Sequence, residues 1–445
     1  MRVTWLDALP VGTTSETVRR VLEAAAADPG GPLTVRAHRL EEARFAPCRG
    51  CFACWVEHPG TCRAKDSANA VMPDIIGADG VLWTTAPRFG AWDPVAKAAL
   101  DKSIGLLSPF FSVVEGETHH RRRYRRYPRW AVLARVGGDT PVDERDVFRQ
   151  LVARNAHNMH EGAPWVGFID EDAPAEDAAE TTREALRALA HPGPSTVPRL
   201  EAFSRPPEVG VPPRSGRHLV TLVGSAKPTG ESTSEAFGAA LERRLVARGW
   251  TAERLPVARV VKLRRPPAPA LREAVARADL LVLAAPVYFD TLPALVLQAL
   301  GQLADHAAQP AGGPAGPPAL LPIVQCGFPE LTHTALALEA AWRAGRACGF
   351  GWAGHLAVGG GGALQGDLDA PRGKLASQVR ALDATAEALD AGEAVPKAAL
   401  DDFARPLLPP ALYRLAGDLG WLVQALQQGA NPLTLGTSRP FPERP

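Results

Sequence analysis

Several features that would assign this chain of 445 residues to a class are missing from it. No stretch of about twenty apolar residues is free of charges and helix breakers, which argues against a transmembrane helix. The 49 Lys and Arg residues nearly balance the 48 Asp and Glu residues. A formal net charge of +1 gives no general attraction to nucleic acid or to an anionic membrane. The first strand-like run meets Asp7 too early for a secretory signal peptide.

Cysteine is scarce, with six residues in the whole chain. Without a secretion signal, so few cysteines favour a reducing compartment, where clustered thiols serve metal or redox chemistry rather than disulfides. We therefore expect a cytoplasmic protein. The length predicts two or three domains, and a hydrophobic content of 46% is enough to bury their cores.

Four of the six cysteines lie within one short segment, with the spacing C-x2-C-x2-C-x7-C. Thiolates at this spacing can converge on one soft metal centre, because two intervening residues let the chain curl between neighbouring sulfurs. Three alternatives stay open for this segment: a 4Fe–4S cluster, a structural zinc ion, or no metal. The candidate ligands are Cys48, Cys51, Cys54 and Cys62.

An internal repeat indicates that the same fold occurs twice. ADGVLWTTAP at 78–87 matches ADLLVLAAP at 278–286, and a helix-like run follows each. Each copy also opens with a strand-like run, RVTWLD in the first and HLVTLVGS in the second. The segment between the copies is rich in Pro, Ala and Glu, which is typical of a partly helical, otherwise extended linker.

In the second copy, five strand-like runs alternate with five helix-like runs. This alternation predicts a doubly wound parallel sheet. The fold class is therefore α/β, with two flavodoxin-like doubly wound domains of three α/β/α layers in tandem and a helical C-terminal extension. The predicted boundaries are 1–170 for the first domain with the cysteine cluster, 171–215 for the linker, 216–395 for the second domain, and 396–445 for the extension.

The first strand of the second copy leads into GSAKPTGESTS, a segment rich in hydroxyl side chains that opens a helix. A helix N-terminus directs free N–H groups at an anion, and a lysine adds positive charge, so the segment predicts a phosphate-binding loop. It is not a Walker loop, because G-x-x-x-x-G-K-[ST] is absent. The candidate residues are Gly224, Ser225, Lys227, Ser232, Thr233 and Ser234.

Two further loops follow later strands of the same copy. Ligands of open α/β sheets bind at the carboxyl ends of the strands, so these loops are expected beside the phosphate loop. An aromatic pair between prolines can pack on a flat ring, and a glycine allows close backbone approach. The candidate residues are Pro286, Val287, Tyr288 and Phe289 in one loop, and Cys326, Gly327, Phe328 and Pro329 in the other.

With these motifs, the second copy resembles the NADPH-dependent FMN reductase family of flavodoxin-like proteins. The family has a G-S-x-x-x-[GN]-S-x-[TS] loop for the FMN phosphate, a P-V-Y loop beside the isoalloxazine, and often C-G-F-P-E at the ring edge. This chain has GSAKPTGESTS, APVYFDTLPA and QCGFPE, with Lys227 where an arginine is common. The resemblance implies FMN and NAD(P)H as cofactors.

The first copy resembles the iron–sulfur flavoprotein branch of the same family, in which cysteines at this spacing hold a 4Fe–4S cluster. The resemblance implies such a cluster here as a further cofactor. The first copy departs from the family at its phosphate loop, where Asp7 and Ala8 replace Gly-Ser. Since a carboxylate repels a phosphate, we expect the first copy to have lost its own FMN.

The resemblance implies an FMN-dependent NAD(P)H oxidoreductase that passes hydride or electrons to a quinone, flavin or iron–sulfur acceptor. The two copies would form an internal pseudo-dimer, and a homodimer is a further option. The alternative is a non-enzymatic electron-transfer protein with FMN and a cluster that serves a protein partner. No catalytic side chain is assigned, because the flavin itself performs the redox chemistry.

Overall fold

The computed structural model describes the chain except for residues 29–32, 192, 194–198, 206–216, 267, 308–316, 365, 371 and 444–445. Its contacts divide the chain into two compact units. Unit 1 consists of Met1–Arg199 with Arg414–Pro445, and unit 2 of Leu200–Tyr413. In the part of the chain that the structure describes, no helix is both long and apolar enough to cross a membrane.

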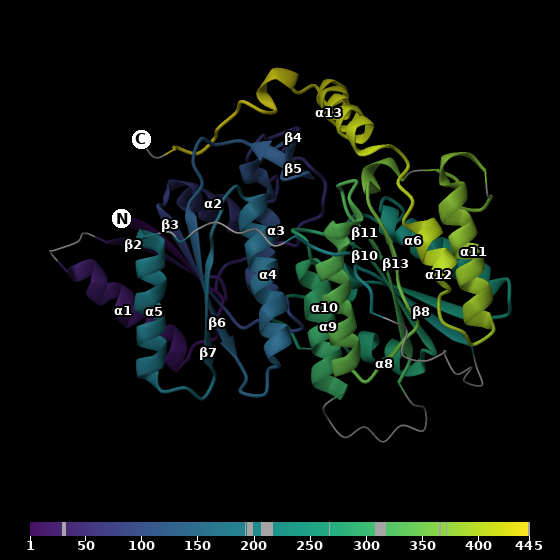
Figure 1. Ribbon diagram of the computed structural model, residues 1–445, viewed down its shortest axis with the longest axis horizontal. Helices are drawn as coiled ribbons and strands as arrows, with labels where there is room; N and C mark the ends of the chain where they lie inside the picture. The colour runs from purple at the N-terminus through teal and green to yellow at the C-terminus, as the bar shows by residue number, and fades with distance from the viewer. Residues whose placement is uncertain are drawn as a thin grey trace. The chain divides into compact units, whose positions relative to one another are not determined.

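Unit 1 is built on a five-stranded parallel sheet with the order β2-β1-β3-β6-β7 (Figure 1). Numbered along the sheet's own strands this order is 2-1-3-4-5, the doubly wound order of flavodoxin. The strands are β1 (Arg2–Asp7), β2 (Thr34–Arg39), β3 (Gly80–Thr85), β6 (Arg129–Val136) and β7 (Trp165–Asp170).

Helices cover both faces of this sheet. On one face α1 (Thr13–Ala27) and α5 (Ala175–Ala190) pack side by side over an apolar core. On the other face, Trp83 of β3 contacts Trp92, which in turn meets Phe148 of α4 edge to face. Further elements of this unit are α2 (Ala68–Gly77), α3 (Pro94–Lys102), α4 (Val142–Asn158) and the antiparallel pair β4 (Leu107–Val114) and β5 (Glu117–Arg122).

Unit 2 repeats the same order as β9-β8-β10-β11-β12, with β13 also paired to β11. Every residue of β10 is buried, as expected for a central parallel strand covered on both faces. The fold class predicted from the sequence is thereby confirmed. The strands are β8 (His218–Val223), β9 (Thr251–Pro256), β10 (Leu280–Pro286), β11 (Ala319–Gln325), β12 (Gly351–Trp352) and β13 (Leu356–Val358).

The helices of unit 2 also form two layers. One layer packs with the core that contains Phe237 and Phe403, and the other contains α9 and α10 in mutual contact. The helices are α6 (Thr233–Val246), α7 (Val257–Val260), α8 (Pro269–Arg277), α9 (Ala294–Ala307), α10 (Ala335–Ala347), α11 (Ala376–Asp390) and α12 (Lys397–Phe403).

The compact units and the predicted boundaries differ at two places. The segment expected to be a linker begins with α5, which packs on β6 and β7 and therefore belongs to unit 1. Residues 192, 194–198 and 206–215 of that linker lie outside the described residues. In the predicted extension, α12 belongs to unit 2, whereas α13 (Pro410–Gln427) continues into unit 1 after Tyr413.

Candidate functional site

The candidate site of unit 2 lies at the carboxyl ends of its parallel strands, where four loops follow β8, β10, β11 and β13. Because the strands are parallel, all four loops lie at the same end of the sheet, beside the point where the strand order reverses. Three of the loops are those predicted from the sequence. The fourth is a run of glycines at 359–362 that the sequence analysis did not single out.

The phosphate loop runs from Gly224 into α6. Ser232 is the N-cap of this helix, and its Oγ accepts a hydrogen bond from the Glu235 N–H at 3.5 Å. Glu235 in turn accepts from the Gly230 N–H at 2.8 Å, in a variant of the capping box. The first N–H groups of a helix have no acceptor within it, so α6 directs donors at the loop.

Positive charge reaches the phosphate loop from two segments. Lys227 lies in the loop and contributes its positive charge there, and its backbone N–H donates to the Ser225 Oγ at 3.3 Å. Arg259 of α7 donates to the Thr229 Oγ1 at 3.0 Å, which adds a cation that the sequence analysis missed. The buried serines Ser225, Ser232 and Ser234 supply the hydroxyl groups. This donor set fits a phosphate dianion.

Gly224 has a packing role at the end of β8. A Cβ at this position would lie 2.7 Å from the Val296 Cγ2 and 2.8 Å from the Ala285 Cβ. The glycine is therefore required because β8 ends close against β10 and α9. Packing does not require a glycine at position 327, since a Cβ there would meet nothing within 4 Å.

The loop after β10 contains a tight turn in which Tyr288 and Thr291 exchange backbone hydrogen bonds of 2.9 and 3.2 Å. Its two central residues, Phe289 and Asp290, have φ of 48° and 57°. Left-handed backbone at two consecutive side-chain-bearing residues is strained by roughly 1–2 kcal/mol each and persists only where the surroundings enforce it. Such strain is typical of functional loops.

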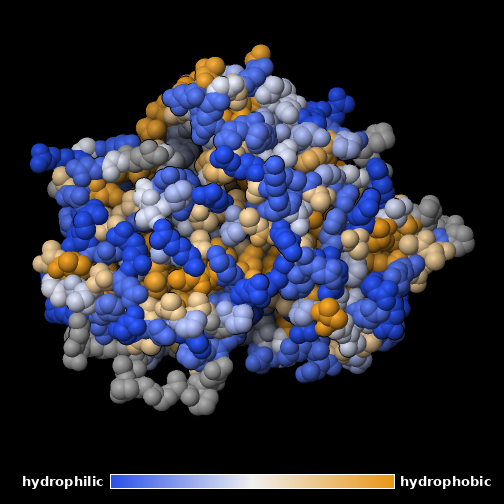
Figure 2. Space-filling model, turned by 180° about the vertical axis from the view of Figure 1, so that it is seen from behind, coloured by the Kyte–Doolittle hydropathy of each residue, from blue (hydrophilic) through white to orange (hydrophobic). Residues whose placement is uncertain are grey.

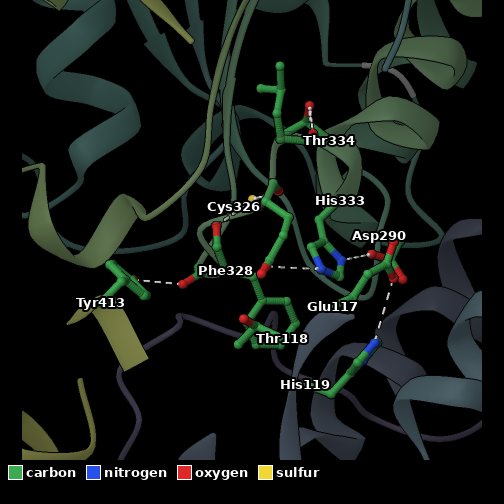
Figure 3. A network of polar contacts seen from close by, with 12 residues as sticks. Glu117, Thr118, His119, Asp290, Cys326, Phe328, His333, Thr334 and Tyr413 are labelled. Atoms are coloured by element: carbon green, nitrogen blue, oxygen red, sulfur yellow. Dashed lines mark hydrogen bonds and ion pairs between the residues drawn. The ribbon is translucent and has the colours of Figure 1, made fainter. Parts of the chain in front are cut away.

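A buried polar pair joins this turn to the loop after β11. The Asp290 Oδ1 lies 2.8 Å from the Nδ1 of His333, and both side chains are almost fully buried. Figure 3 shows the imidazole pointing at the carboxylate, with Phe328 nearby. The ring centroids of Phe328 and His333 are 4.8 Å apart. The pair thus fixes the aromatic residues of one loop against the other.

The loop after β11 is also held from its other side. The Gly361 N–H donates to the Cys326 carbonyl and the Gly360 N–H to the Phe328 carbonyl, both at 2.7 Å. The Tyr413 hydroxyl donates to the Gly327 carbonyl at 2.7 Å (Figure 3). The loop is therefore preorganised before any ligand binds.

Cys326 is a packing residue in this loop rather than a nucleophile. Its Sγ lies 3.2 Å from the Phe328 carbonyl oxygen. Burial raises the pKa of the Cys326 thiol to about 12, so the thiol stays protonated at neutral pH.

Sequence reasoning missed Asp290, His333, Tyr413 and the glycines at 359–362. The sequence held a signal for the glycines, because four of them follow the fifth strand in a row. It also held one for Asp290, which directly follows the aromatic pair Tyr288 and Phe289. No sequence pattern could have paired Asp290 with His333.

In unit 1, the place of the phosphate loop is filled by the chain's own carboxylate. The fully buried Asp7 accepts hydrogen bonds from the Leu9 N–H at 3.1 Å, the Ser15 hydroxyl at 2.5 Å and the Thr84 hydroxyl at 2.6 Å. Arg39 forms an ion pair with the same carboxylate. The hydroxyl groups and the cation that would attract a phosphate are thus directed at Asp7.

The cysteine loop of unit 1 packs against the end of α3. Lys102 donates to the Cys62 Sγ at 3.2 Å and to Asp66 at 3.0 Å. Although burial works against its charge, the Asp66 carboxylate and the Cys62 sulfur hold the pKa of Lys102 above its usual value. Burial, followed by the charge of Asp101, raises the pKa of the Cys48 thiol to about 12.

The four cysteines of this loop stay candidate metal ligands, as their spacing predicts. All four cysteines are among the described residues, and within these residues no group of three or more His, Cys, Asp or Glu side chains is placed to hold a metal ion.

No protein-family model and no curated protein matches this chain. Solved structures that resemble it include an FMN-dependent NADH-azoreductase from Bacillus anthracis in complex with FMN, with 12% identity and a TM-score of 0.32 over 42% of this chain and 97% of that one. An NAD(P)H:quinone oxidoreductase from Methanothermobacter marburgensis has 13% identity and a TM-score of 0.33 over 43% of this chain and 98% of that one. A flavodoxin from Streptococcus pneumoniae TIGR4 has 15% identity and a TM-score of 0.26 over 39% and 97%. These likenesses carry no argument of their own, and the fold is defined by the strand order described above.

Proposed function

We propose that unit 2 binds one FMN and that the protein is an FMN-dependent NAD(P)H oxidoreductase. The proposal rests mainly on the hydrogen-bond donors of the phosphate loop. These donors lie beside two loops that are held together by the chain's own contacts. All three loops lie where the strand order of the flavodoxin-like sheet reverses, which is where such sheets bind ligands. In the proposal, FMN supplies the chemistry of accepting a hydride from NAD(P)H and passing electrons to a quinone, flavin or iron–sulfur acceptor.

The phosphate of FMN would be held by hydroxyl groups, helix N–H groups and two cations. Arg259 contacts the Thr229 hydroxyl in the same loop. In the proposal it neutralises the second negative charge of the phosphate, which Lys227 alone would leave unbalanced. The carboxylate of Glu235 does not oppose the phosphate, because it accepts from the Gly230 N–H and lies 3.8 Å from Arg254. The proposed phosphate residues are Ser225, Lys227, Ser232, Thr233, Ser234 and Arg259.

The ring would lie between the loop at 286–289 and the loop at 326–329. Asp290 and His333 act as positioning residues in this proposal, because they connect the two loops. No general base is needed for hydride transfer to a flavin, so the chain's task is to orient the acceptor and exclude water. The cysteine loop of unit 1 takes no part in this proposal.

The proposal is tested by titrating the FMN-free protein with FMN and following quenching of the flavin fluorescence. Lys227→Ala and Arg259→Ala should each weaken FMN binding by about tenfold, since a hydrogen bond to a charged group contributes about 1.5–3 kcal/mol. Thr13→Ala, at the start of the corresponding helix of unit 1, is the matched control and should leave binding unchanged.

Activity is then measured as NAD(P)H oxidation with a quinone acceptor. Loss of turnover in parallel with loss of FMN supports an enzyme. Tight FMN binding with no NAD(P)H oxidation would instead indicate an electron carrier, and failure to bind FMN at all would refute the proposal.

A further inference from the structure

The helix α13 is anchored to unit 1 by one of its faces. Its Asp418 accepts a hydrogen bond from the Phe111 N–H of β4 at 2.8 Å. A Cβ at Gly417 would lie 2.5 Å from the Phe111 ring, which shows how closely the helix packs on this strand. Trp421 meets the ring of Trp55 edge to face at 5.1 Å. These contacts fix the direction of the opposite face.

The opposite face of α13 is apolar and exposed. The two charged side chains of the helix, Arg414 and Asp418, contact the β4–β5 hairpin, so the exposed face has no charge. Figure 2 shows apolar residues near the top of the view, over the part of the chain where Figure 1 places α13. We call this face the α13 stripe; its large members, with their exposed fractions, are Leu412 (53%), Leu415 (59%), Leu419 (54%), Val423 (51%) and Leu426 (66%).

The spacing along the α13 stripe is that of a coiled-coil seam. Leu412, Leu419 and Leu426 recur every seven residues, and the exposed residues Ala416 and Val423 fall between them with steps of four and three. Leucine at one seam position with a β-branched residue at the other is typical of two-stranded pairing, and Val423 fits this pattern, whereas Ala416 is a small residue at the same kind of position. Random surface leucines would not follow this period.

We propose that α13 pairs with α13 of a second copy of this chain, with the α13 stripe as the seam. An uncharged stripe with a heptad repeat is complementary to itself, which is what a two-fold interface requires. The exposed apolar area of one stripe is roughly 400 Å², the size of the largest apolar patch on a typical soluble protein, and such patches are often functional. Two stripes with the small residues between them bury about 1,000 Å², the lower limit of a specific interface.

The same face is a poor fit for a lipid surface. Helices that lie in a membrane interface have Lys and Arg along the border of the apolar face. Here the border carries Gln424 and Gln427, and the single Arg of the helix is directed at Thr118. A charged protein partner would likewise find no counter-charge on the stripe.

Sedimentation equilibrium of the full chain tests the proposal. The wild-type protein should be a dimer at micromolar concentration, and Leu419→Glu should raise the dimer dissociation constant by at least about tenfold, because it places a charge in the seam. Gln424→Glu, which adds the same charge outside the seam, should leave the dimer intact. A monomeric wild-type protein, or a Leu419→Glu variant that remains fully dimeric, would overturn the proposal.

Cross-linking gives a second readout that does not depend on the stability of a charged variant. Leu419 is the midpoint of the α13 stripe, so it faces its own counterpart in both parallel and antiparallel pairing. Leu419→Cys should therefore form a cross-linked dimer under mild oxidation, well above the background of the wild type and of Gln424→Cys. Equal cross-linking in all three proteins, or wild-type protein that stays monomeric and sediments with anionic vesicles, would contradict pairing.

Discussion

Glu161 is a buried carboxyl group whose pKa is raised by its burial. Its Oε1 accepts from the Ala163 N–H at 3.2 Å. Burial raises the pKa of Glu161 to about 7 from an ordinary value of 4.5. Between these two values the unfolded chain releases a proton that the folded chain keeps, so this group lowers stability as the pH rises.

The variant Glu161→Gln should therefore stabilise the protein at high pH. We expect the free energy of unfolding to rise by about 1–3 kcal/mol at pH 8, since one unit of pKa shift corresponds to about 1.4 kcal/mol. At pH 4.5 the gain should be much smaller, because the carboxyl is protonated in the folded chain and half protonated in the unfolded one. Chemical denaturation at the two pH values measures this, and an equal gain at both would contradict it.

A second residue-scale effect concerns Asp290, where backbone strain and a buried contact oppose each other. Asp290→Gly relieves roughly 1 kcal/mol of left-handed strain but removes the carboxylate that His333 contacts. Loss of a partner for a buried polar group costs about 1–3 kcal/mol. We expect a small net loss of stability and a clear loss of FMN affinity, because the two loops are no longer joined.

Asp290→Asn keeps the shape and an oxygen acceptor, so it should retain more FMN affinity than Asp290→Gly. Flavin titration with denaturation of the same samples separates binding from stability. Equal FMN affinity in Asp290→Gly and the wild type would show that the pair does not position the site.

At the scale of elements, two glycines of the candidate site should respond in opposite ways to the same change. Gly224→Ala places a Cβ within 2.8 Å of two neighbouring side chains, so it should lower the free energy of unfolding by about 1–3 kcal/mol. Gly327→Ala has open space and should leave stability unchanged. If FMN lies against Gly327, its affinity should still fall, whereas an unchanged affinity would remove Gly327 from the site.

The sequence predicted the elements well where one pattern dominated. The fully apolar run of β10 and its match in β3 indicate two parallel sheets, because strands of parallel sheets are covered on both faces and have near-continuous apolar sequences. The fifth strand of unit 2 was harder, since the chain breaks it at Gly354, whose φ of 106° lets the backbone turn beside Val395.

The site was only partly predictable, for a related reason. Loops that follow the strands could be placed at the carboxyl ends of the strands from the strand order alone. The contact of Asp290 with His333 joins residues 43 positions apart in sequence, and no periodicity encodes it. The cysteine spacing favours a metal centre, but spacing alone does not fix the side-chain rotations that bring sulfurs together.

At the scale of the whole molecule, the two units should differ in how they respond to FMN. The proposed phosphate loop of unit 2 offers donors to a ligand, whereas that of unit 1 is occupied by Asp7 and Arg39. We therefore expect one FMN per chain, counted from flavin absorbance after denaturation and the protein concentration. Two FMN per chain would show that unit 1 also binds.

FMN should also stabilise one unit selectively. At a concentration about 100 times its Kd, a ligand that binds the folded state alone adds about 2.7 kcal/mol to the stability of what it binds. Calorimetry should then show one of two unfolding transitions moving to higher temperature, provided the units unfold separately. Lys227→Ala should reduce that shift, and Arg39→Ala, in the corresponding loop of unit 1, should not. A shift that is sensitive to Arg39 instead would move the flavin site to unit 1.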